Sequence, residues 1–174
     1  GMGERFSLAE AAAVFDFDRV NRAGARFDWD KLDWLNAQVL HGLDPEALRQ
    51  QLLPLWKAEG WAITGAATDP AWQLDLCALL APSLTRLSDG VDQAAPFFRR
   101  PEPDQAALDQ LGAPGATAAV AALRDGLSEG PLEADAAKTL LETAATAAGV
   151  KKGVVMKSAR AALLGSLQGP DLLT

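Results

Sequence analysis

Hydrophobic residues recur at helical spacing along almost the whole of this chain. Leu32, Leu35 and Val39 fall on one stripe of the segment 28–42, which ends at Gly42, a residue type that commonly closes a helix. No segment alternates apolar and polar residues for long, tyrosine is absent, and β-branched residues are sparse. The pattern therefore predicts an all-α protein.

Polar caps and prolines indicate where several helices begin and end. Ser7 is followed three residues later by Glu10, which is the spacing of a capping box. Two further starts carry an aspartate cap followed directly by proline: Asp44-Pro45 and Asp69-Pro70. Pro54 is predicted to kink or end the helix that begins at Pro45, because proline lacks the amide donor that the carbonyl four residues earlier needs.

The clearest break in the helical pattern is RRPEPDQ at 99–105, where two prolines interrupt a charged run. The chain beyond it consists of short alanine-rich segments, whose small side chains let helices approach closely. We therefore expect a compact helical bundle in two lobes. Trp34, Trp56 and Trp72 lie among leucines, so they are predicted to pack in the core rather than to stack on bases.

Charge and composition narrow the classes of protein. The 174 residues carry a formal net charge of -7, which argues against indiscriminate nucleic-acid binding, although residues 150–174 hold four basic residues and only one acid. The single cysteine, Cys77, cannot form an internal disulfide and suits a reducing cytosol. No apolar run approaches the roughly 18 to 20 residues that span a bilayer, and no signal peptide is evident. The sequence predicts a cytoplasmic protein without a membrane partner.

The sequence offers little catalytic chemistry. His41 is the only histidine, so a catalytic triad and a multi-histidine metal site both lack members, and we expect it to interact with carbonyl groups at a helix end. The sequence has no cysteine pair, and it has no glycine-rich phosphate-binding loop of the kind that follows a strand. The paired acids at 16/18 and 28/30 are predicted to cap helices. This chain alone is therefore expected to be non-catalytic, with no cofactor or metal of its own.

Two stretches resemble one family. FDFDRVNRAGARFDWDKLDWLNAQVL (15–40) resembles the segment that follows the catalytic core of bacterial glutamyl-tRNA synthetases, and the tail resembles that family's ending, R-x-A-L-[TL]-G-S-x-x-G-P-x-L. The first pattern is matched by Arg19, Val20, Asn21, Gly24, Ala25, Phe27, Asp28, Lys31, Leu32, Trp34, Leu35 and Asn36. The second is matched by Arg160, Ala162, Leu163, Gly165, Ser166, Gly169, Pro170 and Leu172.

The resemblance implies the tRNA-facing part of a class I glutamate–tRNA ligase, with the end of a stem-contact region at 1–43 and an all-α anticodon-binding domain at 44–174. The domain is expected to divide into its two lobes near 99–105. The family's catalytic signatures are missing here, so ATP and magnesium would be used by a part of the parent enzyme outside this chain. The implied partner is glutamate tRNA, and the protein is expected to be a monomer.

The resemblance also assigns anticodon contacts. In the family, the arginine matching Arg160 and the loop matching Gly169, Pro170 and Leu172 contact anticodon bases. Independently, Ser158 is predicted to cap a short helix that Gly165 closes, which would place Arg160 in its first turn and Lys157 just before the cap. Cations beside free helix amides would form an anion site. A solvated surface arginine and an ordinary turn are the alternative.

A basic cluster near the N-terminus is a second candidate contact, with the tRNA backbone. It consists of Arg19, Arg22, Arg26 and Lys31. Pairing of each residue with the neighbouring acids at 16, 18, 28 and 30 is an equal alternative.

Ser83 departs from the family's pattern. Many members place there an arginine that helps to check the third anticodon base, accepting C and rejecting G. Serine is too short for that reach and carries no charge. The departure predicts a non-discriminating enzyme that also loads glutamate onto glutamine tRNA, unless Arg86 takes over the check. The alternative for the whole chain is a helical protein-interaction or oligomerisation module that binds no RNA.

Overall fold

Helices account for all the regular secondary structure that the computed structural model describes, which covers residues 6–19, 24, 26–61, 64–127 and 132–172. This confirms the predicted all-α class. The α-helices are α1 (Leu8–Val14), α2 (Trp29–His41), α3 (Pro45–Ala58), α4 (Pro70–Leu80), α5 (Asp89–Asp92), α6 (Ala95–Phe98), α7 (Gln105–Leu111), α8 (Ala116–Gly126), α9 (Ala134–Ala148) and α10 (Lys152–Leu164). Three 3-10 turns are η1 (Phe17–Arg19), η2 (Gly65–Thr68) and η3 (Ala81–Ser83).

The helix starts follow the predicted caps. The carboxylates of Asp28, Asp44 and Asp69 each accept a hydrogen bond from an amide in the first turn of α2, α3 and α4. Ser7 and Glu10 form the reciprocal capping box of α1. Short polar side chains thus satisfy amides that the helices themselves leave free.

Pro54 does not end its helix, because α3 continues to Ala58. Leu52 and Trp56 flank the proline and are fully buried, so packing on both sides holds the last turn in place. The indole Nε1 of Trp56 also donates a hydrogen bond to the carbonyl of Gly90 at 3.0 Å. Tertiary contacts here outweigh the one backbone hydrogen bond that proline removes.

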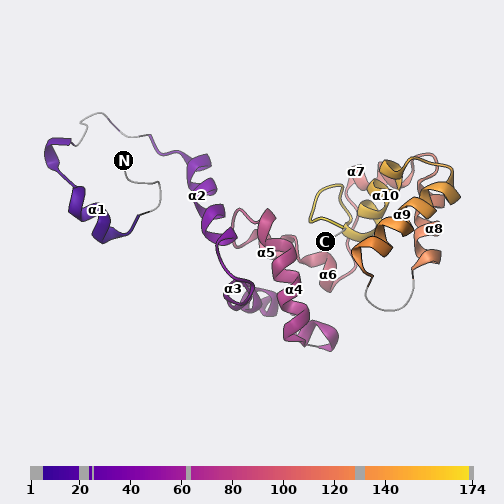
Figure 1. The fold of residues 1–174 in the computed structure, drawn as a ribbon, viewed down its shortest axis with the longest axis horizontal. Helices are drawn as coiled ribbons and strands as arrows, with labels where there is room; N and C mark the ends of the chain where they lie inside the picture. Colours follow the sequence, from indigo (N-terminus) through magenta and orange to yellow (C-terminus); the bar gives the residue numbers. More distant parts are fainter. Residues whose placement is uncertain (1–5, 20–23, 25, 62–63, 128–131, 173–174) are drawn as a thin grey trace.

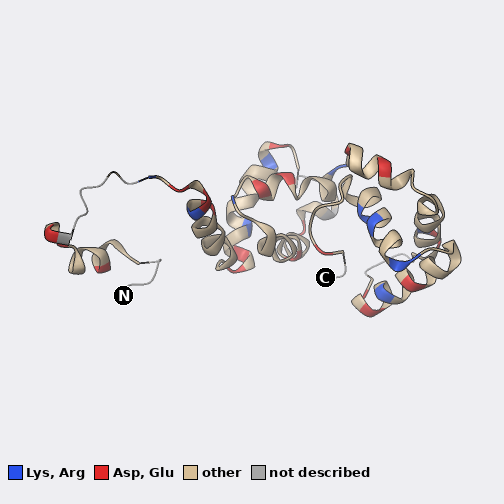
Figure 2. Ribbon diagram, turned by 90° about the horizontal axis from the view of Figure 1, so that it is seen from above, with Lys and Arg blue, Asp and Glu red and all other residues tan. Residues whose placement is uncertain are grey.

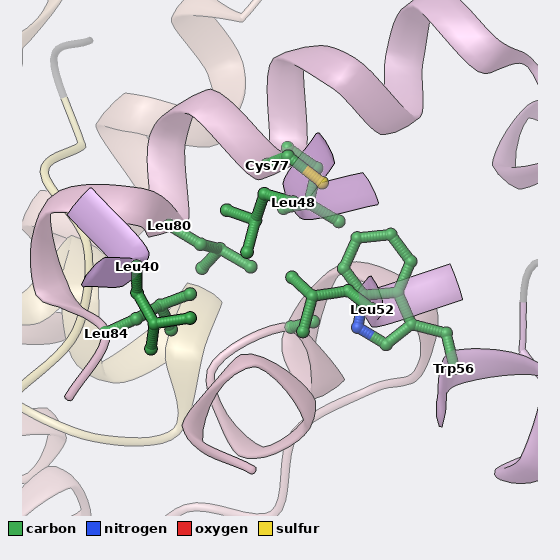
Figure 3. Close-up of a cluster of buried hydrophobic side chains, with 9 residues drawn as sticks. Leu40, Leu48, Leu52, Trp56, Cys77, Leu80 and Leu84 are labelled. Carbon is green, nitrogen blue, oxygen red and sulfur yellow. The ribbon is translucent and has the colours of Figure 1, made fainter. Parts of the chain in front are cut away.

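The first hydrophobic core lies between α3 and α4. Figure 3 shows Leu48, Leu52 and Trp56 of α3 facing Cys77 and Leu80 of α4. Burial raises the pKa of the Cys77 thiol to about 11, so the thiol is protonated at neutral pH. This core fixes the place of η3, which follows α4 directly.

The second core joins α8, α9 and α10 around mostly small side chains. Its buried members are Ala119, Leu141, Ala144, Ala145 and Val155. Ser158 lies in the middle of α10 with its side chain fully buried, where its Oγ accepts a hydrogen bond from Gln110 at 3.1 Å. The predicted cap at Ser158 is therefore wrong, because α10 begins six residues earlier, at Lys152. Val155 and Met156 pack in or against this core, and this packing stabilises the helical turn before Ser158. The predicted end at Gly165 is confirmed.

The N-terminal part packs least. α1 has no buried residue and lies apart from the other helices in Figure 1. α2 meets the first core chiefly through Leu40, while Leu32 and Val39 of the predicted stripe are exposed. Trp34 is 48% exposed, so its predicted place in the core is wrong. Trp56 is buried and Trp72 packs against the first core, as predicted.

The helices form two groups, α3 to α6 around the first core and α7 to α10 around the second, and the groups meet at the proline segment 99–105. The amide of Asp104 donates a hydrogen bond to the carbonyl of Gly165 at 2.8 Å, so the start of α7 is joined to the end of α10. The C-terminal segment then runs back towards the first group (Figure 1). Its residues Gly169 and Pro170 line a cavity together with Ser83. Figure 2 shows acidic and basic positions on both groups of helices.

Candidate nucleic-acid interface

Arg160 holds the C-terminal loop. Its Nη1 atom donates hydrogen bonds to the carbonyl oxygens of Gly169 at 2.8 Å and Pro170 at 3.0 Å. The backbone φ of Gly169 is 138°, a conformation that favours glycine, and an added Cβ would lie 2.8 Å from Leu164 Cδ1. Arginine and glycine together therefore set the course of this loop.

The predicted place of Arg160 within its helix is wrong. Because α10 begins at Lys152, Arg160 lies in its later turns, away from the free amides of the N-terminus. The anion site predicted from a cation beside those amides does not form. The guanidinium instead binds two carbonyl groups, which are acceptors and not anions.

A cavity of about 420 Å³ lies where the C-terminal loop meets the first group of helices. Ser83, at the end of η3, lines it together with Gly169 and Pro170. The other lining residues are Asp92, Gln93, Pro96, Leu164, Ser166 and Gln168. The fold therefore brings Ser83 to the same cavity as two loop residues that are far away in the sequence. Arg160 does not line the cavity but bonds the carbonyls of those two residues.

Lys157 and Leu172 do not line this cavity. Lys157 is exposed on α10. Leu172 is half-buried and lines an apolar groove of about 300 Å³ between α8, α9 and α10, with neighbours that include Leu132 and Leu140. The six predicted anticodon residues are thus divided between the cavity wall, the loop support, an exposed helix face and a separate groove.

The predicted N-terminal basic cluster is described only in part. Arg22 and the side chain of Arg19 lie outside the described residues. Arg26 is exposed and lines a polar hollow with Phe27, Asp28, Trp29 and Asp30. The backbone amide of Lys31 donates to the Asp28 carboxylate at 3.0 Å, which is the cap of α2.

Arg86 is engaged elsewhere. It donates two hydrogen bonds to Asp33 of α2, and these bonds, together with the attraction between the two charges, lower the pKa of Asp33 and raise that of Arg86. It is not among the residues that line the cavity beside Ser83. His41 likewise bonds a neighbouring segment, with its Nε2 atom 2.9 Å from the Leu84 carbonyl.

Gln93, Asp92 and Gln168 were missed by sequence reasoning. Gln93 lies ten residues after Ser83, at the end of α5, and contacts it because the chain turns between η3 and α5. Gln168 lies near the C-terminus and lines the same cavity. Neither contact follows from periodicity. The one available signal was the tail pattern G-S-x-x-G-P-x-L, in which Gln168 is an unspecified position directly before Gly169.

Within the parts of the chain that the structure describes, no three residues of the types His, Cys, Asp and Glu are grouped so that they could hold a metal ion. None of the described helices is long and apolar enough to cross a membrane.

Comparison with known proteins gives concordant results. The model of a family described as anticodon binding domain matches residues 46–174. Glutamate–tRNA ligases of Synechococcus sp. strains CC9605 and RCC307 are 62% and 59% identical, covering 100% and 99% of this chain and 36% of each of those proteins. The chain thus spans about a third of the length of these relatives. A crystal structure of a glutamate tRNA ligase from Elizabethkingia meningosepticum superimposes with a TM-score of 0.72 at 27% identity, over 91% of this chain and 31% of that one.

Proposed function

Because the chain belongs to the family of anticodon binding domains, we propose that it recognises the anticodon of tRNA as one part of a longer glutamate–tRNA ligase. The observation that carries this proposal is the cavity wall formed by Ser83, Gly169 and Pro170, whose loop Arg160 holds through two carbonyl contacts. Proteins read single-stranded RNA by hydrogen bonds to the edges of unstacked bases. A cavity between the two groups of helices, which offers apolar walls together with the polar side chains of Ser83 and Gln93, suits one such base.

In this proposal, the roles differ from one predicted residue to another. Ser83, Gly169 and Pro170 line the base cavity, and Arg160 positions the loop through its two carbonyl contacts. Lys157, exposed on α10, would contact a phosphate, whereas Leu172 would act only through the packing of the loop end. Arg26 and Lys31 would meet the tRNA backbone away from the cavity, as would Arg19 and Arg22, which the structure does not describe in full.

The activity of the longer protein is proposed from its relatives. It would attach glutamate to glutamate tRNA, and to glutamine tRNA as well, with ATP and magnesium used by the portion outside this chain. Residues 1–43 would be the end of the stem-contact region and 44–174 the anticodon domain, whose two lobes divide near 99–105. The two separate hydrophobic cores support this division. We expect a monomer.

A protein-interaction module without RNA binding is the less favoured function. Its support was the set of alanine-rich helices, but alanines of α8 and α9 are packed in the second core together with Val155 of α10. The matching family model is also that of an anticodon-binding domain.

Titration of the 174-residue chain with glutamate tRNA at several salt concentrations tests the proposed function. Contacts with phosphates release counterions, so affinity is expected to fall steeply as log salt rises. An anticodon stem-loop RNA should compete for the chain, whereas an acceptor-stem hairpin should not. Binding that is indifferent to salt, or equal for both hairpins, would contradict the proposal.

A further inference from the structure

The side chain of Gln93 meets that of Ser83 on the wall of the cavity. The Ser83 hydroxyl oxygen lies 2.5 Å from Gln93 Oε1 and 2.8 Å from the carbonyl oxygen of Leu80. Gln93 Nε2 lies 3.5 Å from the Ser83 carbonyl, which is a long and weak contact. Both side chains line the same cavity, so the pair offers polar atoms to whatever enters it.

A hydroxyl group has one hydrogen, so Ser83 cannot donate to both of its neighbours at once. In one arrangement it donates to Gln93 Oε1, and the amide nitrogen of Gln93 is the end left for a ligand. In the other, it donates to the Leu80 carbonyl and accepts from the amide nitrogen of Gln93 turned over about its last bond. This gives up the weak contact of Nε2 with the Ser83 carbonyl and leaves the amide oxygen for a ligand. Oxygen and nitrogen of an amide have nearly the same shape, so turning over changes no packing.

The two arrangements match two different bases. The Watson–Crick edge of cytosine offers one amino donor beside ring nitrogen and carbonyl acceptors. That of guanine offers a carbonyl acceptor beside two donors. An amide that presents either its nitrogen or its oxygen can therefore form a hydrogen bond with either edge. Asp92, which lines the same cavity, has only acceptors when ionised and cannot make this exchange.

We propose that Gln93 is the specificity-determining residue of this cavity, and that its amide, turning over together with the Ser83 hydroxyl, accepts cytosine and guanine alike. This inference rests on the proposed function, because it takes the occupant of the cavity to be an anticodon base. Relaxed recognition of the base would then result from the uncharged Ser83–Gln93 pair, which can present either a donor or an acceptor, and not from the shortness of serine alone. It also predicts that a fixed charge at position 93 restores discrimination.

The direction of that discrimination depends on the sign of the charge. Gln93→Lys offers only donors and should favour the acceptors of cytosine, while Gln93→Glu offers only acceptors and should favour the donors of guanine. The probes are two anticodon stem-loop RNAs that differ only in cytosine or guanine at the third anticodon position. The measured quantity is the ratio of their affinities, because a change of charge also alters the binding of any RNA.

We expect the unchanged chain to bind both RNAs within about threefold of each other, and each variant to shift the ratio by about tenfold, in opposite directions. Gln51→Lys and Gln51→Glu are the matched controls, since Gln51 is exposed on α3 and does not line the cavity. These controls should keep the ratio of the unchanged chain. Helical circular dichroism and melting temperature show whether each variant is folded.

Shifts in opposite directions would establish Gln93 as the residue that selects the base. Equal ratios in all five proteins, or a shift of the same sign in both Gln93 variants, would overturn the inference while leaving the proposed function intact. Failure of the unchanged chain to bind either RNA would overturn the proposed function, and this inference with it.

Discussion

Arg86 and Asp33 form a two-pronged ion pair that joins the turn before α5 to α2. Arg86 Nε donates to Asp33 Oδ1 at 2.9 Å, and Nη2 donates to Oδ2 at 2.6 Å. Beside this pair, the Asn36 side-chain amide donates to the Thr85 carbonyl at 2.6 Å. Because α2 buries little apolar surface, these polar contacts attach it to the first group of helices in addition to the buried Leu40.

The pair should make the attachment of α2 depend on pH. Hydrogen bonds from Arg86 hold the pKa of Asp33 below its ordinary value, so the contribution is present above the unfolded pKa and is lost as the pH falls through the folded one. Asp33→Asn should lower the urea midpoint at neutral pH, and the difference from the unchanged chain should shrink below about pH 4. Asp135→Asn removes a carboxylate that is 96% exposed and paired with Lys138, so it should change the midpoint little at any pH. A difference that is the same at all pH values would refute this role of the ion pair.

Gly165 should tolerate alanine less well than Gly149 does. Both residues close helices with positive φ, of 68° and 64°, and alanine in that conformation costs about 1–2 kcal/mol. A Cβ at Gly165 would also lie 2.8 Å from the Glu102 carbonyl oxygen and 2.9 Å from Pro101 Cβ, whereas nothing lies within 4 Å at Gly149. We expect Gly165→Ala to lose about a further 1–3 kcal/mol in urea unfolding. Equal losses in the two variants would show that the segment at Pro101 and Glu102 shifts to accommodate the added Cβ at little cost in stability.

Much of the fold follows from local signals in the sequence. The aspartate caps, the capping box and the closing glycine all act within a few residues, and each was predicted correctly. The errors came from packing between distant segments. Pro54 and Ser158 carry strong local signals for a helix end and a helix start, but the two cores override both. Trp34 has a helical apolar pattern, yet α2 turns that face to solvent.

The candidate site was predicted through resemblance and not through spacing. Residues 15–40 and the tail identify the family correctly, and the comparisons confirm it. The contact of Arg160 with the Gly169 and Pro170 carbonyls could not be derived from the sequence, because it depends on how the loop folds back over α10. The pairing of Ser83 with Gln93 depends likewise on the η3 turn.

Arg160→Ala should weaken RNA binding without loss of helix. Removing the guanidinium leaves the Gly169 and Pro170 carbonyls without their partner, so the loop that walls the cavity is expected to loosen. We expect an affinity loss of about 1–3 kcal/mol for both stem-loops, with cytosine and with guanine at the third anticodon position. Amide hydrogen exchange should become faster in residues 166–172. Arg124→Ala is the control, since Arg124 is exposed on α8 and paired with Asp125. If the affinity falls while the exchange of the loop is unchanged, Arg160 contacts RNA directly and is not a positioning residue.

If the proposed relaxed recognition is correct, Ser83→Arg should make the parent enzyme discriminate between the two tRNAs. At position 83 an arginine would extend into the cavity and displace the Ser83–Gln93 contact, and it would present donors only. Cytosine would keep its acceptors opposite those donors, while guanine would lose the acceptor that its ring amide needs. The parent enzyme should therefore load glutamate onto both glutamate and glutamine tRNAs, and the Ser83→Arg enzyme should reject glutamine tRNA by a further factor of about ten or more, since one base contact accounts for about 1–3 kcal/mol.

Two controls separate this effect from a general change of charge. Ser88→Arg adds the same cation at an exposed residue that does not line the cavity, and it should leave the ratio of the two tRNAs unchanged. Arg86→Ala tests whether Arg86 discriminates the third anticodon base. Because Arg86 is paired with Asp33, this variant should also leave the ratio of the two tRNAs unchanged. If the unchanged enzyme already rejects glutamine tRNA by more than about a hundredfold, then a neutral side chain at position 83 is compatible with strict recognition. The choice between the two tRNAs would in that case be made by groups outside the Ser83 cavity.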